Sequence, residues 1–153
     1  MEDLSVSAKR LSWSYYVLSV ATLALSVAIA VRLYPSAFDW QYTVVSALAS
    51  QKHNPQGGVW FSAGLGLSLV WLWPFVKGFA LRPLAERSFG ERFSFGALRL
   101  GIVFGGLMAL ESILDLEGPL GAKKLHEALA LFCFLSFYTG IIGLSISRLR
   151  SDR

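Results

Sequence analysis

Six ionisable side chains of this 153-residue chain are suited to binding a ligand or transferring a proton. They are four carboxylates and two imidazoles: Asp39, His53, Glu111, Asp115, His126 and Glu127. Glu111 and Asp115 are four residues apart and share one helical face, and a short Gly-Pro turn brings His126 close to them. An imidazole oriented by a carboxylate can act as a general acid or base near neutral pH. Glu111 and His126 are therefore the catalytic candidates.

The same residues also have structural interpretations, which remain open from sequence alone. Glu127 would be favoured near a helix N-terminus by the macrodipole. Arg32 is the natural counter-ion for Glu111, and this ion pair would fix helix packing. Carboxylate and imidazole groups can ligate a divalent metal, but no spacing here is specific for one. No metal site and no cofactor is therefore predicted.

Four apolar runs are the elements that must position these residues. Hydrophobic residues make up 54% of the chain and charged residues 16%, against about 25% charged in an average soluble domain. A bilayer core about 30 Å thick requires about 20 apolar residues in a helix. The expected spans cover approximately 13–31, 59–76, 95–116 and 125–146. We predict an all-α, integral membrane four-helix bundle that forms one domain over 1–153.

The distribution of Lys and Arg predicts the orientation of these spans. If both termini are cytoplasmic, ten basic residues lie inside and four (Arg32, Lys52, Lys123 and Lys124) lie outside. This asymmetry fits the positive-inside rule. The basic pI near 9.5 then reflects topology and anionic lipid rather than a nucleic-acid partner. A multi-pass protein of the bacterial inner membrane, with both termini cytoplasmic, is expected.

The first apolar run has a second interpretation. Ala28-Ile29-Ala30 resembles a small-residue cleavage site, so residues 13–31 could belong to a signal peptide. The run is longer than a usual signal core, and Glu2 and Asp3 offset Lys9 and Arg10. A retained first span is the favoured interpretation.

The long connection between the first two spans predicts a short amphipathic helix. Asp39, Thr43, Ser46 and Ser50 fall at i, i+4, i+7 and i+11, which is the spacing of one helical face. Such a helix could be an interfacial anchor or a lid over the outer end of the bundle. In the second case a binding pocket is expected, formed by Asp39, Ser46, His53, Asn54, Glu111, Asp115, His126 and Glu127.

The same loop and the span after it contain short segments that resemble those of other membrane proteins. Phe38-Asp39-Trp40, Val45–Ser50, Asn54-Pro55 and Trp60–Leu65 resemble a group of multi-span membrane families related to the DRAM-like proteins of eukaryotes. His126-Glu127 at the mouth of a span also looks like that group. The chain departs from that group in having four spans, where those families usually have about six, and in placing Ala47 where an acidic residue often follows the loop serine. The resemblance implies an integral membrane protein connected with lipids or membrane homeostasis.

Three functions remain open at this stage. The first is a non-enzymatic membrane protein that binds membrane lipids or a protein partner in an outer polar pocket. The second is a membrane-embedded enzyme that uses Glu111 and His126 on a lipid headgroup. The third is a small oligomeric transporter. Small residues on the spans, including Ser19, Thr22 and Ser26 and the Gly101–Gly105–Ala109 ridge, predict close helix seams within the chain or a homo-oligomer.

Overall fold

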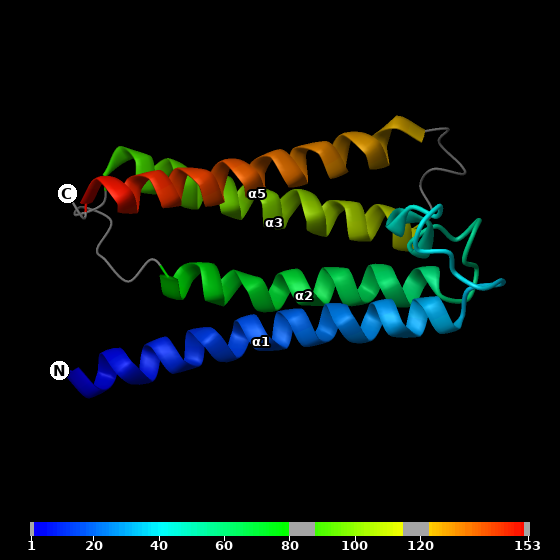
Figure 1. Ribbon diagram of the computed structural model, residues 1–153, viewed down its shortest axis with the longest axis horizontal. Coiled ribbons are helices and arrows are strands. Elements are labelled where there is room, and N and C mark those ends of the chain that lie inside the picture. Colours follow the sequence, from blue (N-terminus) through cyan, green and yellow to red (C-terminus); the bar gives the residue numbers. More distant parts are fainter. Residues whose placement is uncertain (1, 80–87, 115–122, 152–153) are drawn as a thin grey trace.

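The computed structural model describes residues 2–79, 88–114 and 123–151 (Figure 1). Its elements are α1 (Glu2–Arg32), the 3-10 helix η1 (Val45–Leu48), α2 (Gly58–Phe79), α3 (Phe89–Leu114) and α5 (Lys123–Ser151). No strand occurs within these residues. The predicted all-α bundle of four long helices is confirmed. The expected third span, 95–116, ends two residues beyond the described part of α3.

The four long helices have the length and composition of membrane spans. Their apolar segments are Arg10–Arg32, Gly58–Gly78, Phe89–Leu114 and Lys124–Leu149, with 23, 21, 26 and 26 residues. Large apolar side chains such as Leu25 and Phe134 face outward from the bundle. In water such extensive apolar exposure would be a liability, whereas hydrocarbon is as apolar as these side chains. The chain is an integral, multi-pass membrane protein.

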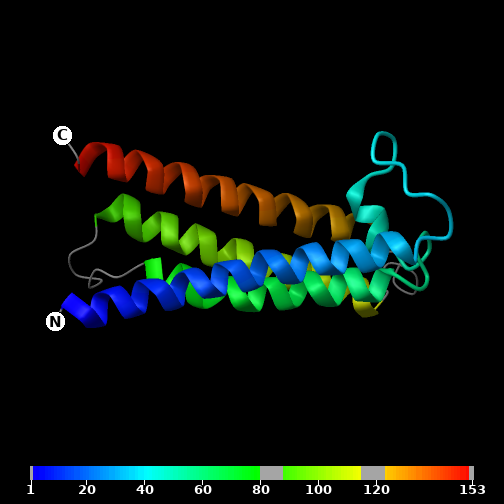
Figure 2. The same ribbon diagram turned by 60° about the horizontal axis from the view of Figure 1, so that its bottom comes forward.

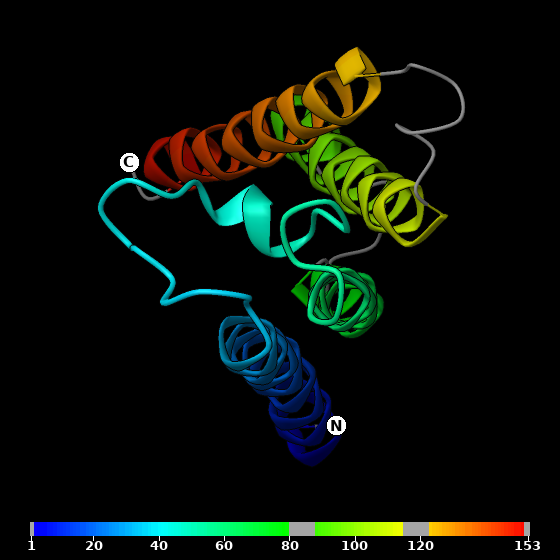
Figure 3. The same cartoon turned by 90° about the vertical axis from the view of Figure 1, so that its right-hand side faces the viewer.

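The helices form two antiparallel hairpins joined along one side. α1 packs along α2, α3 packs along α5, and α2 packs against α3. Seen along the helices, α1, α2, α3 and α5 therefore follow an arc, and η1 lies inside it (Figure 3). The start of α1 and the end of α5 lie at the same end of the bundle (Figure 1), which we call the terminal end. The opposite end, which carries η1, is the loop end.

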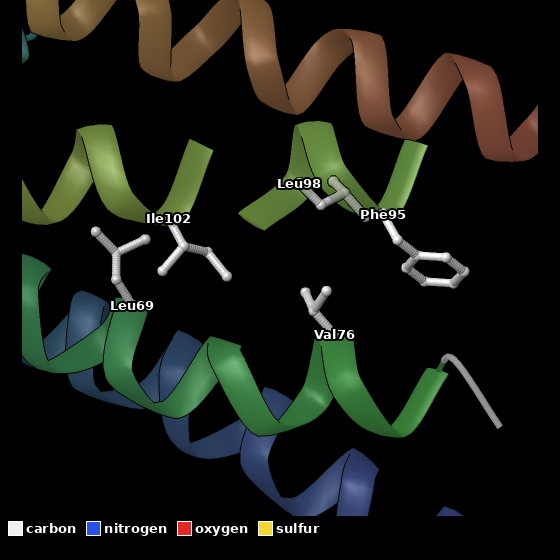
Figure 4. Packing of buried hydrophobic residues seen from close by; sticks show 5 residues of the cluster. All are labelled: Leu69, Val76, Phe95, Leu98 and Ile102. Carbon is white, nitrogen blue, oxygen red and sulfur yellow. The ribbon is translucent and has the colours of Figure 1, made fainter. Parts of the chain in front are cut away.

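The main apolar core lies between α2 and α3. Leu69 and Val76 of α2 pack against Phe95, Leu98 and Ile102 of α3 (Figure 4). Side chains of α5, including Phe137, cover this cluster from the other side. A second cluster at the loop end joins Ala30, Leu48, Ala49 and Phe61. It fastens η1 to the ends of α1 and α2.

Small residues let α1 and α2 approach closely. Ser12, Ser19 and Ser26 are seven residues apart, and all three are buried. A Cβ added to Gly64 would overlap the Ser26 side chain, and one added to Gly78 would meet Ser12. The predicted hydroxyl stripe on α1 is therefore a helix seam within the chain, although Thr22 is only half-buried.

The small-residue ridge on α3 is likewise an interhelical seam. The Phe137 ring of α5 lies 3.0 Å from the position of a Cβ at Gly101. At Gly105 the corresponding neighbours are Leu69 of α2 and Cys133 of α5. Ala109 is 2% exposed and lies opposite Gly66 of α2. α3 is thus held between α2 and α5.

The connection from α1 to α2 differs from the predicted amphipathic helix. Only the four residues of η1 are helical, and the preceding segment projects sideways from the loop end (Figure 2). The Asp39 carboxylate accepts hydrogen bonds from the backbone N–H groups of Gln41 (2.8 Å) and Tyr42 (3.3 Å). Such local side-chain bonds compete with helix formation. The β-branched run Thr43-Val44-Val45 adds a further cost to a helix.

Candidate functional site

A cavity of about 950 Å³ lies at the loop end of the bundle. Its walls come from the α1–α2 connection and from the facing ends of α3 and α5. The lining contains hydroxyl, amide, ammonium, imidazole and carboxylate groups. The polar members are Tyr34, Tyr42, Thr43, Ser46, Ser50, Gln51, Lys52, His53, Glu111, Ser112, His126 and Glu127.

The centre of the site is a hydrogen-bonded pair between α3 and α5. His126 Nδ1 lies 3.0 Å from Glu111 Oε2. The Glu111 side chain is 4% exposed and that of His126 is 21% exposed. The neighbouring Ser112 hydroxyl donates to the same carboxylate oxygen at 3.4 Å. Because a buried carboxylate requires a partner, the position of His126 explains how Glu111 is accommodated within an apolar helix.

Three further lining residues of the cavity, Ser50, Gln51 and His53, come from the connection between α1 and α2. The Gln51 amide donates to the carbonyl oxygens of Ser112 (2.9 Å) and Ile113 (3.0 Å). These carbonyls belong to the last described turn of α3. Gln51 therefore ties the connection to the helix that carries Glu111. The Ser50 hydroxyl contacts His53 Nδ1 at 3.0 Å.

Asn54 is a buried residue whose hydrogen bonds fix the conformation of the connection. It is fully buried, and its amide nitrogen donates to the carbonyls of Ala30 (3.0 Å) and Leu48 (3.2 Å). Its amide oxygen accepts from the Gly57 N–H at 3.0 Å. A Cβ on Gly57 would collide with this amide. Asn54 thus joins the end of α1, η1 and the turn into α2, and it does not line the cavity.

The structure brings together five of the eight residues predicted to form the pocket. Ser46, His53, Glu111, His126 and Glu127 all line the cavity. Asp39 and Asn54 do not, because Asp39 caps an exposed turn and Asn54 is buried behind the wall. Asp115 lies outside the described residues.

The predicted ion pair between Arg32 and Glu111 requires correction. The hydrogen-bond partner of Glu111 is His126, and among the described residues no ion pair joins Arg32 to Glu111. Arg32 is exposed at the end of α1, and α1 packs on α2 rather than on α3. The helix order therefore separates the two side chains.

Several cavity residues were not singled out from the sequence. Tyr34, Tyr42, Lys52 and Gln51 line the cavity, and Gln51 also donates hydrogen bonds to two carbonyl oxygens of α3. A single glutamine in a polar loop gives no local sequence signal that its side chain contacts a distant helix such as α3. The position of Lys52 between Ser50 and His53 is the one signal that could have drawn attention to this segment.

The site is suited to hydrogen bonding and proton transfer. With Nδ1–H donated to Glu111, the neutral His126 ring keeps its other nitrogen as an acceptor. A carboxylate that orients an imidazole in this way is a common arrangement in general acid–base catalysis. Within the described residues, no three His, Cys, Asp or Glu side chains lie close enough to hold a metal ion.

No family model, curated protein or solved structure matches this chain.

Proposed function

We propose that this multi-pass membrane protein binds the polar headgroup of a membrane lipid in the cavity at its loop end. The observation that carries the proposal is the Glu111–His126 pair, 3.0 Å apart, in the wall of an open cavity with a mixed polar and apolar lining. The cavity is lined by the connection between α1 and α2 and by the facing ends of α3 and α5. The ends of membrane spans are where lipid headgroups meet the hydrocarbon core, which supports a headgroup as the ligand.

The lining chemistry supports a headgroup as the ligand. Lys52 supplies a cation, Glu127 an anion, and Ser46 and Ser50 supply hydroxyls. A zwitterionic or polyol headgroup presents complementary groups, and binding sites use such convergent polar side chains to fix orientation. The resemblance to the DRAM-like group supports the same connection with lipids.

We further propose that both termini face the cytoplasm of a bacterial cell and that the cavity faces the outer leaflet. The support is the excess of Lys and Arg at the terminal side, ten residues against four. The positive-inside rule relates such an excess to the cytoplasmic face.

Headgroup binding predicts a localised photo-crosslink. The protein would be placed in lipid nanodiscs that contain phosphatidylethanolamine with a diazirine on its headgroup, and crosslinked peptides would be mapped by mass spectrometry. We expect crosslinks within residues 42–53. Lys52→Gln and His126→Gln should each lower their yield about tenfold, because each removes a strong hydrogen bond to the ligand.

Lys124→Gln is the matched control, since Lys124 is exposed near the start of α5 but outside the cavity lining. It should crosslink like the wild type. Crosslinks confined to the lipid-facing helix surfaces, or an equal yield from Lys52→Gln and Lys124→Gln, would contradict headgroup binding. Lys52 is exposed, so its substitution does not endanger the fold.

A second candidate function is a reaction on the bound headgroup, and the Glu111–His126 geometry favours it. Glu111 would orient His126, and His126 would act as a general base or acid. The nanodisc lipids would be analysed for conversion after incubation with the wild type, Glu111→Gln and His126→Ala. General acid–base catalysis predicts a loss of about 10²–10⁴-fold in both variants. Equal conversion by all three proteins would exclude this role for the pair.

A further inference from the structure

Two cationic side chains flank one tryptophan in the terminal half of the bundle. Lys77 Nζ and Arg99 Cζ each lie 6.0 Å from the centre of the Trp73 ring. Trp73 and Lys77 belong to α2, and Arg99 belongs to α3. The ring therefore brings together two positive charges from neighbouring helices at the end of the molecule opposite the cavity.

Arg99 lacks the counter-ion that a charge within an apolar helix normally has. Its Nε is buried and has no hydrogen-bond partner, which makes it one of two such side-chain atoms in the described part of the chain. Neither Arg99 nor Lys77 forms an ion pair with a carboxylate of the described residues. Ionisable residues in membrane spans are costly and usually pair with another group. Because neither cation has a carboxylate partner among the described residues, the two charges point to an anion from outside the chain.

The positions of Trp73 and Lys77 near the end of α2 support headgroup depth for this anion. Arg99 of α3 lies beside the same ring. Trp73 is six residues before the end of α2, and Lys77 is two residues before it. Tryptophan is enriched where headgroups meet the hydrocarbon core. The planar guanidinium binds phosphate through two parallel N–H groups, which an isolated aromatic contact leaves unused.

We propose that Lys77, Trp73 and Arg99 bind the phosphate of an anionic phospholipid in the leaflet at the terminal end. The recognised feature is a phosphodiester whose negative charge no cation of the same headgroup offsets, and the acyl chains lie along the exposed apolar surface of α2 and α3, where Val70 and Leu100 face outward. This site is independent of the cavity at the loop end, because it uses other residues and the opposite leaflet.

Native mass spectrometry tests this site with defined lipids. The protein in detergent would be titrated with phosphatidylglycerol or with phosphatidylcholine, which carry the same phosphodiester but differ in net charge. We expect the wild type to retain phosphatidylglycerol in preference to phosphatidylcholine. Each removed charge near the membrane surface should weaken that retention about fivefold. Lys77→Gln should therefore retain phosphatidylglycerol about fivefold more weakly than the wild type. The Lys77→Gln/Arg99→Gln protein should retain it well over tenfold more weakly.

Arg32→Gln is the matched control, because it removes one exposed basic residue at the loop end and should leave the preference unchanged. Lys77 is also exposed, so Lys77→Gln alone tests the proposal if the double variant fails to fold. Equal retention of the two lipids by the wild type would overturn the proposal, as would an unchanged preference in Lys77→Gln. Displacement of the lipid by millimolar glycerol phosphate, which has no acyl chains, would show a site for soluble phosphates and would also overturn it.

Discussion

His126→Ala is expected to lower the free energy of unfolding by about 2–3 kcal/mol, because it leaves a buried carboxylate without its main hydrogen-bond partner. The substitution leaves the Glu111 carboxylate, 4% exposed, with only the 3.4 Å contact from Ser112. An unpaired buried carboxylate costs more than the loss of the contact itself. Reversible unfolding in mixed detergent micelles, followed by circular dichroism, measures the change.

A double-mutant cycle separates this pair from general packing. Glu111→Gln combined with His126→Ala should be less destabilised than the sum of the single variants, by about 1–3 kcal/mol. Glu127→Ala is the control, because Glu127 is the next residue on α5 and is exposed; it should cost less than about 1 kcal/mol. Additive effects of the two single substitutions would show that the pair does not stabilise the fold.

Gly64→Leu is expected to separate α1 from α2. Even a Cβ at this position overlaps the Ser26 side chain, so a leucine forces the two helices apart along their seam. Overpacking of this kind costs about 3 kcal/mol, and the close helix contact that small residues provide in lipid is lost. The same unfolding assay measures the loss.

Gly106→Leu provides the matched control for this prediction. Gly106 is also within a long apolar helix, but a Cβ there meets nothing within 4 Å. Leucine has a higher helix propensity than glycine, so this variant should be as stable as the wild type or more stable. Equal destabilisation by the two substitutions would show that the α1–α2 seam is not the cause.

The four spans could be predicted from the sequence because hydropathy along a helix is a local property. The membrane requires a continuous apolar run for each crossing, and α2 and α5 enclose the predicted 59–76 and 125–146. The need for a partner at Glu111 was also predictable, since an isolated carboxylate in a span is costly. The identity of that partner depended on the order of the helices, and this order places α5, not α1, beside α3.

The connection between α1 and α2 shows why periodicity alone was insufficient. The i, i+4, i+7 and i+11 pattern suggested one helical face, but the Asp39 carboxylate binds the backbone N–H groups of its own turn. The conformation of the α1–α2 connection instead depends on distant contacts, such as those of Gln51 with α3 and of Asn54 with Ala30. Local sequence patterns contain no record of such contacts. Of the residues that the connection contributes to the cavity, Ser46 and His53 were predicted from the sequence.

The central claim is that four crossings place the cavity on the membrane side opposite both termini. Accessibility of single cysteines tests it most directly, after Cys133, the single cysteine of the chain, is replaced by serine. Gln56→Cys, at an exposed position of the loop end, should react with a membrane-impermeant maleimide on intact bacterial cells. Ser5→Cys and Ser151→Cys should react only after the cells are lysed. Labelling of either terminal cysteine on intact cells together with Gln56→Cys would contradict the account.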